Sequence, residues 1–442
     1  MALRQFTEKG GRSEQFQRRS RPSLIIHLKG KTKRHMITRY YVTCPGCDST
    51  ILLRLSVGLE REQPFYFVCR NCNAATRGKL VIWYEPCPGH KLELEEGTVI
   101  DDVVPHDQVV NIDPSFPSIA EAGEIWEEGG SPFLMHHKLL GDRFIEVNSR
   151  LNTFCQVKDK DWPKLRRLIG YYIDRNWKPF DDEGRRIFEK EWPRIADDWH
   201  RHDIIHKLLD VFLIPLCVNR YYLDMKIEWC TSSIFKHPSK NLFSFVSECV
   251  ESGELQSAQR DIFHCLEQFV ENTGGLLPGL SVLLYDEKNR PSNLRLFRDD
   301  FPRLRDLYVA TFETCHHLLR YPLATINIQE RKNAGDFGVG RKKSLGPFDK
   351  LKNAKKAEYL DCLPVWQAYW PIVLDRNLRN LISHHEIRHD LPSGKLVVPG
   401  EEIPYSDFVS KCILLIHPIL AMANALKTLL VAHCFQLSKR KK

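Results

Sequence analysis

The sequence lacks an uninterrupted apolar run long enough to cross a membrane. Its most apolar long stretch, residues 412–435, is broken by His417, Asn424 and Lys427, among other residues. A transmembrane helix needs about 20 predominantly apolar residues. We therefore expect a buried core helix here and no membrane partner. No apolar segment follows Met1 either, so we expect no signal peptide.

Regularly spaced cysteines are also scarce, although the chain contains 14 cysteines. Only Cys44 with Cys47 and Cys69 with Cys72 form close pairs, and the others are scattered. This usage favours a metal site in a reducing compartment over a disulfide scaffold. We therefore expect a cytoplasmic protein. The sequence contains no internal repeat.

The net charge of +8 is unevenly distributed, because acidic residues are few in two stretches of the chain. Residues 1–40 contain eleven Lys or Arg against two Glu, and residues 331–356 contain nine against two Asp. Such basic blocks attract polyanions. Charge runs of this kind are also typical of solvated tails and loops.

Periodicity and composition predict a mainly α protein with a small β region near its N-terminus. Residues 1–35 form a basic, mobile arm and residues 36–85 a β-rich module. Residues 86–130, which are rich in Pro, Gly and acidic residues, form a linker. Residues 131–250, with five Trp, form a helical middle domain, and residues 255–442 a second helical domain.

The C-terminal domain shows four helical segments whose apolar residues recur at steps of three and four. Such spacing places them on one face of each helix, as a four-helix bundle requires. The apolar positions are Ile262, Leu266, Phe269 and Val270; Leu304, Tyr308, Phe312, Cys315 and Leu319; Trp366, Trp370 and Val373, leading into Arg379; and Phe408, Cys412, Leu415, Ile419 and Met422.

The two cysteine pairs predict a structural zinc site. Cys44 and Cys47 are separated from Cys69 and Cys72 by 21 residues. Each C-x-x-C pair lets two thiolates converge on one ion, and a β-hairpin between the pairs would complete a tetrahedron. Four sulfur ligands leave no open coordination position, so we expect no catalytic role for this metal. The module is similar to zinc ribbons in general.

The third helical segment of the C-terminal domain carries the residues Arg379-Asn380-Leu-Ile-Ser-His384. Here the chain resembles the HEPN superfamily of ribonucleases and toxins, whose motif is Arg, a polar residue and then His after four to six intervening residues. The segment 390–398 and the apolar helix after it are also similar to that family. His385 fits the spacing as well as His384 does. The resemblance covers roughly residues 255–440.

The chemistry of these residue types suits RNA cleavage by the neighbouring 2′-hydroxyl. A histidine that titrates near neutrality can serve as base or acid, and an arginine offers a forked cation for phosphate oxygens. Asn380 and His384 are four residues apart, so the amide can orient the imidazole. Arg379 and His384 are five apart, roughly 140° around a helix. They converge only if the helix ends there or a second copy supplies one group.

The resemblance implies a metal-independent endoribonuclease that leaves 2′,3′-cyclic phosphate ends. It further implies a homodimer through the bundle, with RNA, including tRNA, as substrate. HEPN proteins with additional domains resemble antiviral or toxin effectors of prokaryotes, so a phage-derived trigger or an antitoxin is expected as partner. The basic loop containing Arg341, Lys342 and Lys343 is a candidate contact for the RNA backbone.

Two other functions compete with this interpretation. His385-Glu386-Ile-Arg-His389 matches H-E-x-x-H, in which two histidines bind zinc and the glutamate acts as base of a metalloprotease. Asp390, Pro392 and Gly394 follow and should end the helix that this site needs. The third function is a non-catalytic scaffold that binds RNA or protein through an inactive bundle.

Overall fold

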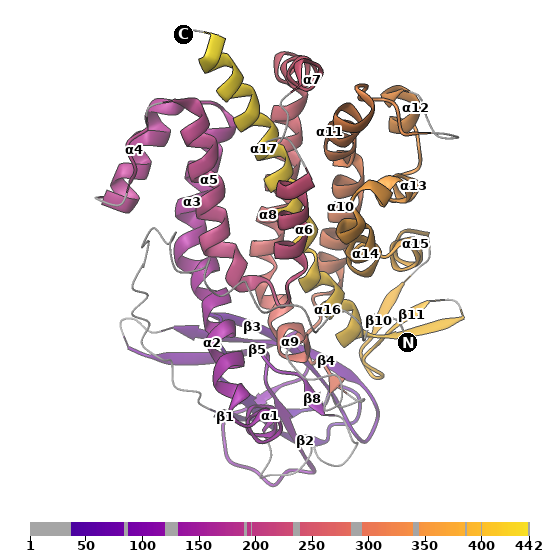
Figure 1. Ribbon diagram of the computed structural model, residues 1–442. Coiled ribbons are helices and arrows are strands. Elements are labelled where there is room, and N and C mark those ends of the chain that lie inside the picture. Colours follow the sequence, from indigo (N-terminus) through magenta and orange to yellow (C-terminus); the bar gives the residue numbers. More distant parts are fainter. Residues whose placement is uncertain are drawn as a thin grey trace.

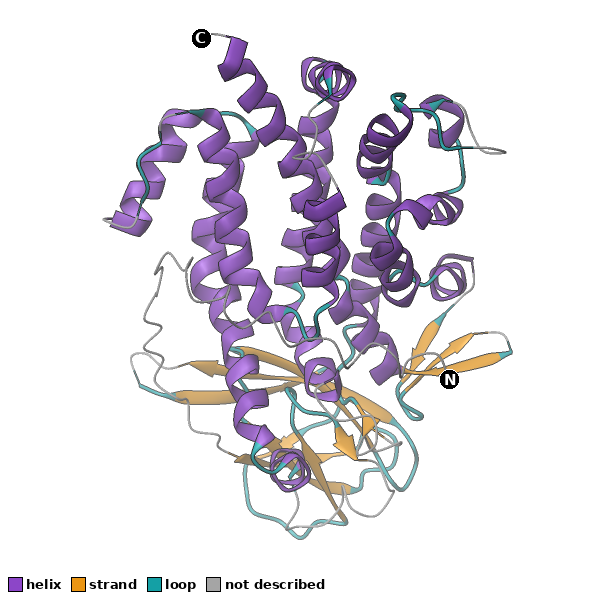
Figure 2. Cartoon of the chain, viewed as in Figure 1, coloured by secondary structure: helices purple, strands orange, loops and turns teal. Residues whose placement is uncertain are grey.

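A computed structural model describes most of the chain. The described residues are 37–83, 87–119, 131–189, 192–195, 197–232, 239–283, 294–338, 344–384, 387–398 and 400–440. The structure is mainly helical, with β-sheets packed below the ends of the long helices (Figure 1, Figure 2). The predicted arm, residues 1–35, and the basic triplet Arg341, Lys342 and Lys343 lie outside the described residues.

The N-terminal β module consists of two small sheets. The first has the strand order β6-β1-β2-β7 and the second β3-β4-β5. Their inward side chains form a hydrophobic core of their own, which includes Ile51, Leu53, Phe67 and Val110. The strands are β1 (Ile37–Thr43), β2 (Thr50–Ser56), β3 (Glu62–Val68), β4 (Ala75–Trp83), β5 (Gly89–Leu94), β6 (Val99–Ile100) and β7 (Gln108–Ile112).

Residues 89–112 belong to this module, so the predicted linker at 86–130 is corrected. β5 pairs with β4, and β7 pairs in parallel with β2, from Ile51 opposite Gln108 to Leu55 opposite Ile112. A further short strand, β8 (Ser118–Ile119), pairs with β9 (Leu294–Arg295). The β2–β7 and β8–β9 pairings join segments that are far apart in sequence, so no local periodicity marks them.

The helices fall into two groups along the chain. The first comprises α1 (Pro132–Leu140), α2 (Arg143–Gln156), α3 (Trp162–Ile173), α4 (Trp177–Phe188), α5 (Asp198–Leu213), α6 (Tyr221–Ser232) and α7 (Lys240–Glu251). The second comprises α8 (Glu254–Glu271), α9 (Thr273–Leu283), α10 (Phe301–Leu318), α11 (Arg320–Arg331), α12 (Leu345–Asp349), α13 (Asn353–Lys356), α14 (Pro364–Val373), α15 (Arg376–His384), α16 (Tyr405–Leu414) and α17 (Ile416–Arg440).

One hydrophobic core contains residues of both helical groups, so the boundary predicted near residue 250 does not separate two cores. The long helix α17 contacts α5, α6 and α7 of the first group and α8, α10 and α11 of the second. In Figure 1 it runs through the middle of the helical layer. Burying apolar surface from both groups against one helix stabilises them together.

The stretch Tyr405–Ser438, which spans α16 and α17, is the one helix among the described residues long and apolar enough to cross a membrane. Its most apolar window is 94% buried inside the protein. Polar residues within it are also buried, such as Asn424 and Thr428. This burial agrees with the prediction of a core helix.

A buried ion cluster joins the β module to the helices. The Arg298 guanidinium contacts Glu60 Oε2 at 2.6 Å and Asp300 Oδ2 at 2.7 Å, and Lys158 Nζ lies 3.1 Å from Glu60 Oε1. Although burial alone would raise it, the pKa of Glu60 is lowered by Arg298 and Lys158. A buried cation shared by two carboxylates fixes the module against the helical body.

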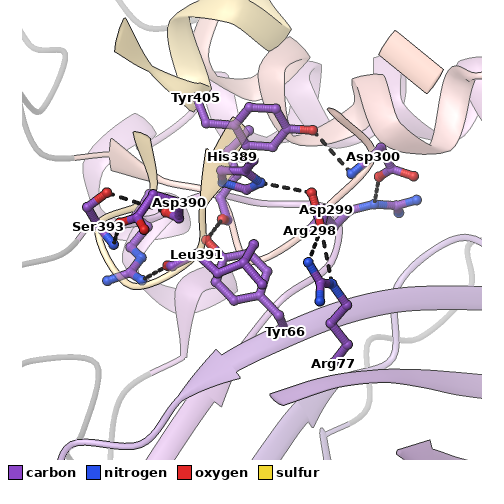
Figure 3. A network of polar contacts seen from close by, with 12 residues as sticks. Tyr66, Arg77, Arg298, Asp299, Asp300, His389, Asp390, Leu391, Ser393 and Tyr405 are labelled. Atoms are coloured by element: carbon purple, nitrogen blue, oxygen red, sulfur yellow. Dashed lines mark hydrogen bonds and ion pairs between the residues drawn. The ribbon is translucent and has the colours of Figure 1, made fainter. Parts of the chain in front are cut away.

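A second set of contacts joins β3 and β4 to the small sheet that follows α15, formed by β10 (Arg388–Asp390), β11 (Lys395–Val398) and β12 (Glu401–Pro404). Asp299 is the central residue of these contacts. It lies 2.8 Å from Arg77 of β4 and 2.9 Å from His389 Nδ1 of β10 (Figure 3). Tyr66 of β3 donates its hydroxyl to the Leu296 carbonyl at 2.8 Å. The β module therefore contacts the segment that continues from α15.

Candidate functional site

Four cysteine sulfurs converge at one end of the β module. The ligand atoms of Cys44, Cys47, Cys69 and Cys72 all lie within 4.8 Å of one another, a spacing compatible with a structural zinc site. Cys44 Sγ is 3.5 Å from Cys72 Sγ, and Cys47 Sγ is 3.6 Å from Cys69 Sγ. Among the described residues, no other group of three or more His, Cys, Asp or Glu side chains meets the same distance test.

Each cysteine pair lies in the turn of its own hairpin, β1–β2 or β3–β4, and the two turns have the same backbone form. Asp48 N donates to the Cys44 carbonyl, and Asn73 N donates to the Cys69 carbonyl. Asp48 and Asn73 both adopt positive φ, 56° and 61°, which Asp and Asn tolerate better than most residues. The predicted single hairpin between the pairs is wrong, because β2 and β3 belong to different sheets.

Gln108, on β7, supports the cluster from outside the two cysteine turns. Its Nε2 donates to Cys69 Sγ at 3.2 Å, and its Oε1 accepts from Arg70 N at 2.9 Å. Burial opposes ionisation of Cys69, but hydrogen bonds from the Cys72 backbone, Gln108 and the Asn71 backbone lower its pKa to about 6. Such outer partners orient metal ligands and favour the thiolate. No spacing motif in the sequence indicated Gln108.

The helix that carries Arg379, Asn380 and His384 is short and starts at a break in the predicted third segment. α14 ends at Val373, and Asp375 Oδ1 accepts from the backbone N–H groups of Asn377 and Leu378 at 2.9 and 3.3 Å. The Tyr308 hydroxyl of α10 accepts from Asp375 N at 2.9 Å. The single third helix that the sequence predicted is therefore two helices, and the N-cap Asp375 starts the second.

Arg379 is held by a carboxylate from another helix. Its Nε donates to Glu313 Oε1 of α10 at 2.7 Å, and Glu313 Oε2 accepts from Asn353 Nδ2 at 2.5 Å. Arg379 Nη1 donates to Asn380 Oδ1 at 3.2 Å, so two of the three predicted catalytic residues contact each other. The guanidinium also lies 5.8 Å from the Phe312 ring centroid. These contacts fix its plane while leaving a quarter of the side chain exposed.

A pocket of about 460 Å³ opens beside Arg379. It is lined by Phe312, Glu313, Lys352, Asn353, Ala354, Lys355, Arg376, Arg379 and Asn380. Four cations against one carboxylate make it electropositive, which suits phosphate groups. Sequence reasoning missed Glu313, Lys352, Lys355 and Arg376, although both lysines belong to the basic block that it identified at residues 331–356.

His384 is the last described residue of α15. The side chain of His384 lies outside the described part of the structure, as does all of His385. His316, one turn beyond Glu313 on α10, is buried and uses both ring nitrogens. It donates from Nδ1 to the Phe312 carbonyl and accepts at Nε2 from Trp370. Burial lowers the pKa of His316 to about 4, so it is neutral at physiological pH.

The H-E-x-x-H segment does not form one turn of a helix. α15 ends at His384, and His389 lies on strand β10, where its Nδ1 contacts Asp299 at 2.9 Å and its ring packs on Tyr405. A metalloprotease of this type needs both histidines on one helix face. This geometry argues against the metalloprotease alternative; His385 and Glu386 themselves lie outside the described residues.

Comparison with known proteins gives no relative on which to base a function: no family model, curated protein or solved structure matches this chain.

Proposed function

We propose that this chain is a metal-independent endoribonuclease of the HEPN type. The observation that carries the proposal is the electropositive pocket at α15, in which Arg379 is oriented by Glu313 and contacts Asn380. A fixed guanidinium beside Lys352 and Lys355 offers the scissile phosphate a preorganised cationic surface. An RNA-degrading effector in prokaryotic defence is the role that the family resemblance implies.

The reaction requires two proton transfers and one phosphoryl transfer. The 2′-oxygen attacks phosphorus and loses its proton to a base, while the 5′-oxygen leaves and takes a proton from an acid. His384 serves as one of these groups, Asn380 orients it, and Arg379 contacts the phosphorane oxygens. The product carries a 2′,3′-cyclic phosphate.

One histidine per motif cannot be base and acid at the same moment, so a two-fold dimer that pairs two motifs completes the chemistry. Isologous dimers are the commonest oligomers. If the sites are composite, mixing Arg379→Ala chains with His384→Ala chains restores part of the activity. If each chain forms a whole site, the mixture is as inactive as its components.

In this proposal zinc has a structural role and takes no part in the reaction. Cys44, Cys47, Cys69 and Cys72 hold one Zn²⁺ with four sulfur ligands, and such a closed set leaves no position for water or substrate. Chemistry at α15 is expected to need no divalent ion.

The testing experiment incubates the full chain with total tRNA and ribosomal RNA in the presence of EDTA. Cleavage in EDTA that is lost in Arg379→Ala, and retained in the matched Arg305→Ala, supports the proposal. Arg305 is a suitable control because it lies on α10 outside the pocket, is exposed and pairs with its neighbour Asp306. An Arg379→Ala protein that cleaves RNA at the normal rate contradicts the ribonuclease.

A non-catalytic RNA-binding scaffold is the second candidate, and the Arg379–Glu313 ion pair is the observation that favours it. A carboxylate already neutralises this guanidinium, so the pocket serves equally to bind an RNA backbone without cleaving it. Under this function Arg379→Ala weakens RNA binding, and no cyclic-phosphate ends are formed by the wild-type protein.

A further inference from the structure

A second pocket, of about 640 Å³, lies along the same helix α15. It has an apolar floor formed by Leu378, Leu381, Ile403 and Phe408. Its polar lining comes from α15 and the residue before it, from β12 and from the first two turns of α16, and it consists of Asp375, Asn377, Asn380, Glu401, Asp407 and Lys411. An apolar floor with a few convergent polar groups is the usual form of a site for a small organic ring.

The two pockets meet at Asn380, which lines both, and they have opposite charge. The first presents four cations and one carboxylate, and the second presents three carboxylates and one ammonium. An RNA phosphate is attracted to the first and repelled by the second. The part of a nucleotide that suits the second pocket is therefore its uncharged base, with the phosphate on the other side of Asn380.

Binding of a metal ion does not explain the carboxylates of the second pocket. Asp375 uses Oδ1 to cap α15, and Lys411 Nζ donates to the Ile372 carbonyl at 2.6 Å. Within the described residues, the four cysteines are the only group of three or more possible ligands close enough to share an ion. Asp375, Glu401 and Asp407 therefore do not form such a group, although each of these carboxylates can accept from a planar ligand.

We propose that this pocket binds a guanine base of the RNA next to the cleaved phosphate, an inference that rests on the proposed ribonuclease function. Guanine presents three N–H bonds on its Watson–Crick edge, more than any other base, and carboxylates accept from such donors. Lys411, one turn after Asp407 on α16, lines the same pocket, and its ammonium can donate to O6. The apolar floor contacts the face of the ring.

The first test measures binding of the 3′-monophosphates of guanosine, adenosine, cytidine and uridine to the full chain by calorimetry. A 3′-phosphate places its charge where the cleaved phosphate would lie. Guanosine 3′-monophosphate should bind on the order of tenfold more tightly than the other three. Equal affinities, or a preference for another base, would overturn the assignment.

Variants of the pocket residues then test which side chains cause the preference for guanosine 3′-monophosphate. Asp407→Asn and, separately, Glu401→Gln should each reduce the preference for guanosine 3′-monophosphate severalfold, while Glu402→Gln should leave it unchanged. Glu402 is the matched control because it adjoins Glu401 on β12, pairs with Lys395 and does not line the pocket. Thermal unfolding of each variant confirms that it is folded. An unchanged preference in both pocket variants would overturn the proposal.

These experiments distinguish failure of the ribonuclease proposal from failure of the base-pocket proposal. A guanine preference without RNA cleavage contradicts the ribonuclease and keeps the base pocket. Cleavage after every base, with no preference in binding, contradicts the base pocket and keeps the ribonuclease.

Discussion

The zinc module and the α15 region both gather polar groups in a small volume, but they do so by different means. In the module, two hairpin turns of the same backbone form each present two sulfurs, and the ligands come from residues 44–47 and 69–72. At α15, the cations come from two separate segments, residues 352–355 and residues 376–379, and Arg379 is oriented by Glu313 of α10. The first arrangement depends on local turns and the second on the packing of distant helices.

This difference determines what each region needs in order to fold. The module has a small core of its own, and four thiols held together without a metal are costly because they repel once ionised. The α15 region draws on the large helical core, in which Leu378 and Ile382 are buried. We therefore expect metal to control the first region and packing to control the second.

Removing zinc should have the largest effect, and it should be confined to the module. Zinc contributes about 10 kcal/mol or more to the folding of small cysteine-rich domains. Replacing Cys44 and Cys69 by Ser should abolish binding of about one zinc per chain and increase hydrogen exchange across residues 37–112. The helical body should keep its protection, because its core is separate.

Elemental analysis and hydrogen exchange measured by mass spectrometry provide the readouts. Cys87→Ser is the matched control, because Cys87 is exposed and is not among the four clustered cysteines. Two zincs per chain would indicate a second metal site, and unchanged exchange in the double variant would contradict a structural role.

The two regions also differ in how far the sequence predicted them. Spacing alone identified all four cysteines, because a C-x-x-C turn is built from adjacent residues. The β-rich character of residues 36–85 was predicted from local sequence signals in the same way, and β2, β3 and β4 lie within this range. Gln108 was not predicted, since β7 reaches the cluster through a parallel pairing with β2.

At α15 the sequence singled out Arg379 and Asn380 but missed the long-range contacts that hold them. Arg379 and Asn380 are neighbours in the chain, and they do contact each other. Glu313 comes from 66 residues away, and no periodicity distinguishes it from an exposed helix residue. The break before α15 includes a contact with Tyr308, also from α10, which local spacing in the sequence does not reveal.

The second prediction concerns catalysis at the end of α15 and decides between two adjacent histidines. His384→Ala should lower the rate of RNA cleavage about 10²–10⁴-fold, which is the usual contribution of a general acid or base. His385→Ala and Glu386→Gln should each change the rate little. Initial rates on a defined RNA, with circular dichroism to confirm folding, provide the measurement. The reverse order of the two histidine variants would assign the role to His385.

The third prediction tests how firmly the two regions are joined. Arg298→Met leaves the buried carboxylates of Glu60 and Asp300 without their shared cation, which should lower the free energy of unfolding by about 3–5 kcal/mol. Arg305→Met, at an exposed arginine, should cost little. Urea unfolding at neutral pH provides the comparison, and equal stability of the two variants would show that the cluster contributes nothing.

The stability that this cluster contributes should depend on pH. The pKa of Glu60 is lowered in the folded protein, with its cationic partners outweighing burial. A lowered pKa contributes stability that is complete above the ordinary value of 4.5 and is lost as the pH falls below it. The difference in stability between wild type and Arg298→Met should therefore shrink on acidification below this value.

The last and smallest effect is expected at Asp299, the residue that contacts both the module and the segment after α15 (Figure 3). Asp299→Asn keeps the shape of the side chain and removes its charge. Nearly half of the Arg77 side chain is exposed, so that ion pair contributes little, whereas the His389 side chain is buried. We expect a loss of about 1 kcal/mol, mostly from the contact with His389.

A double-mutant cycle separates the two contacts of Asp299. Combining Asp299→Asn with Arg77→Ala should show almost no coupling, and combining it with His389→Gln should show most of the loss. Asp306→Asn, at an exposed helix position, is the control. Burial raises the pKa of Asp299, but His389 and Arg77 lower it by more, so that the pKa is below its ordinary value of 3.8. The stability that Asp299 contributes should therefore be lost as the pH falls below 3.8. Stronger coupling to Arg77 than to His389 would mean that the module is held to this segment by its surface charge and not by the buried histidine.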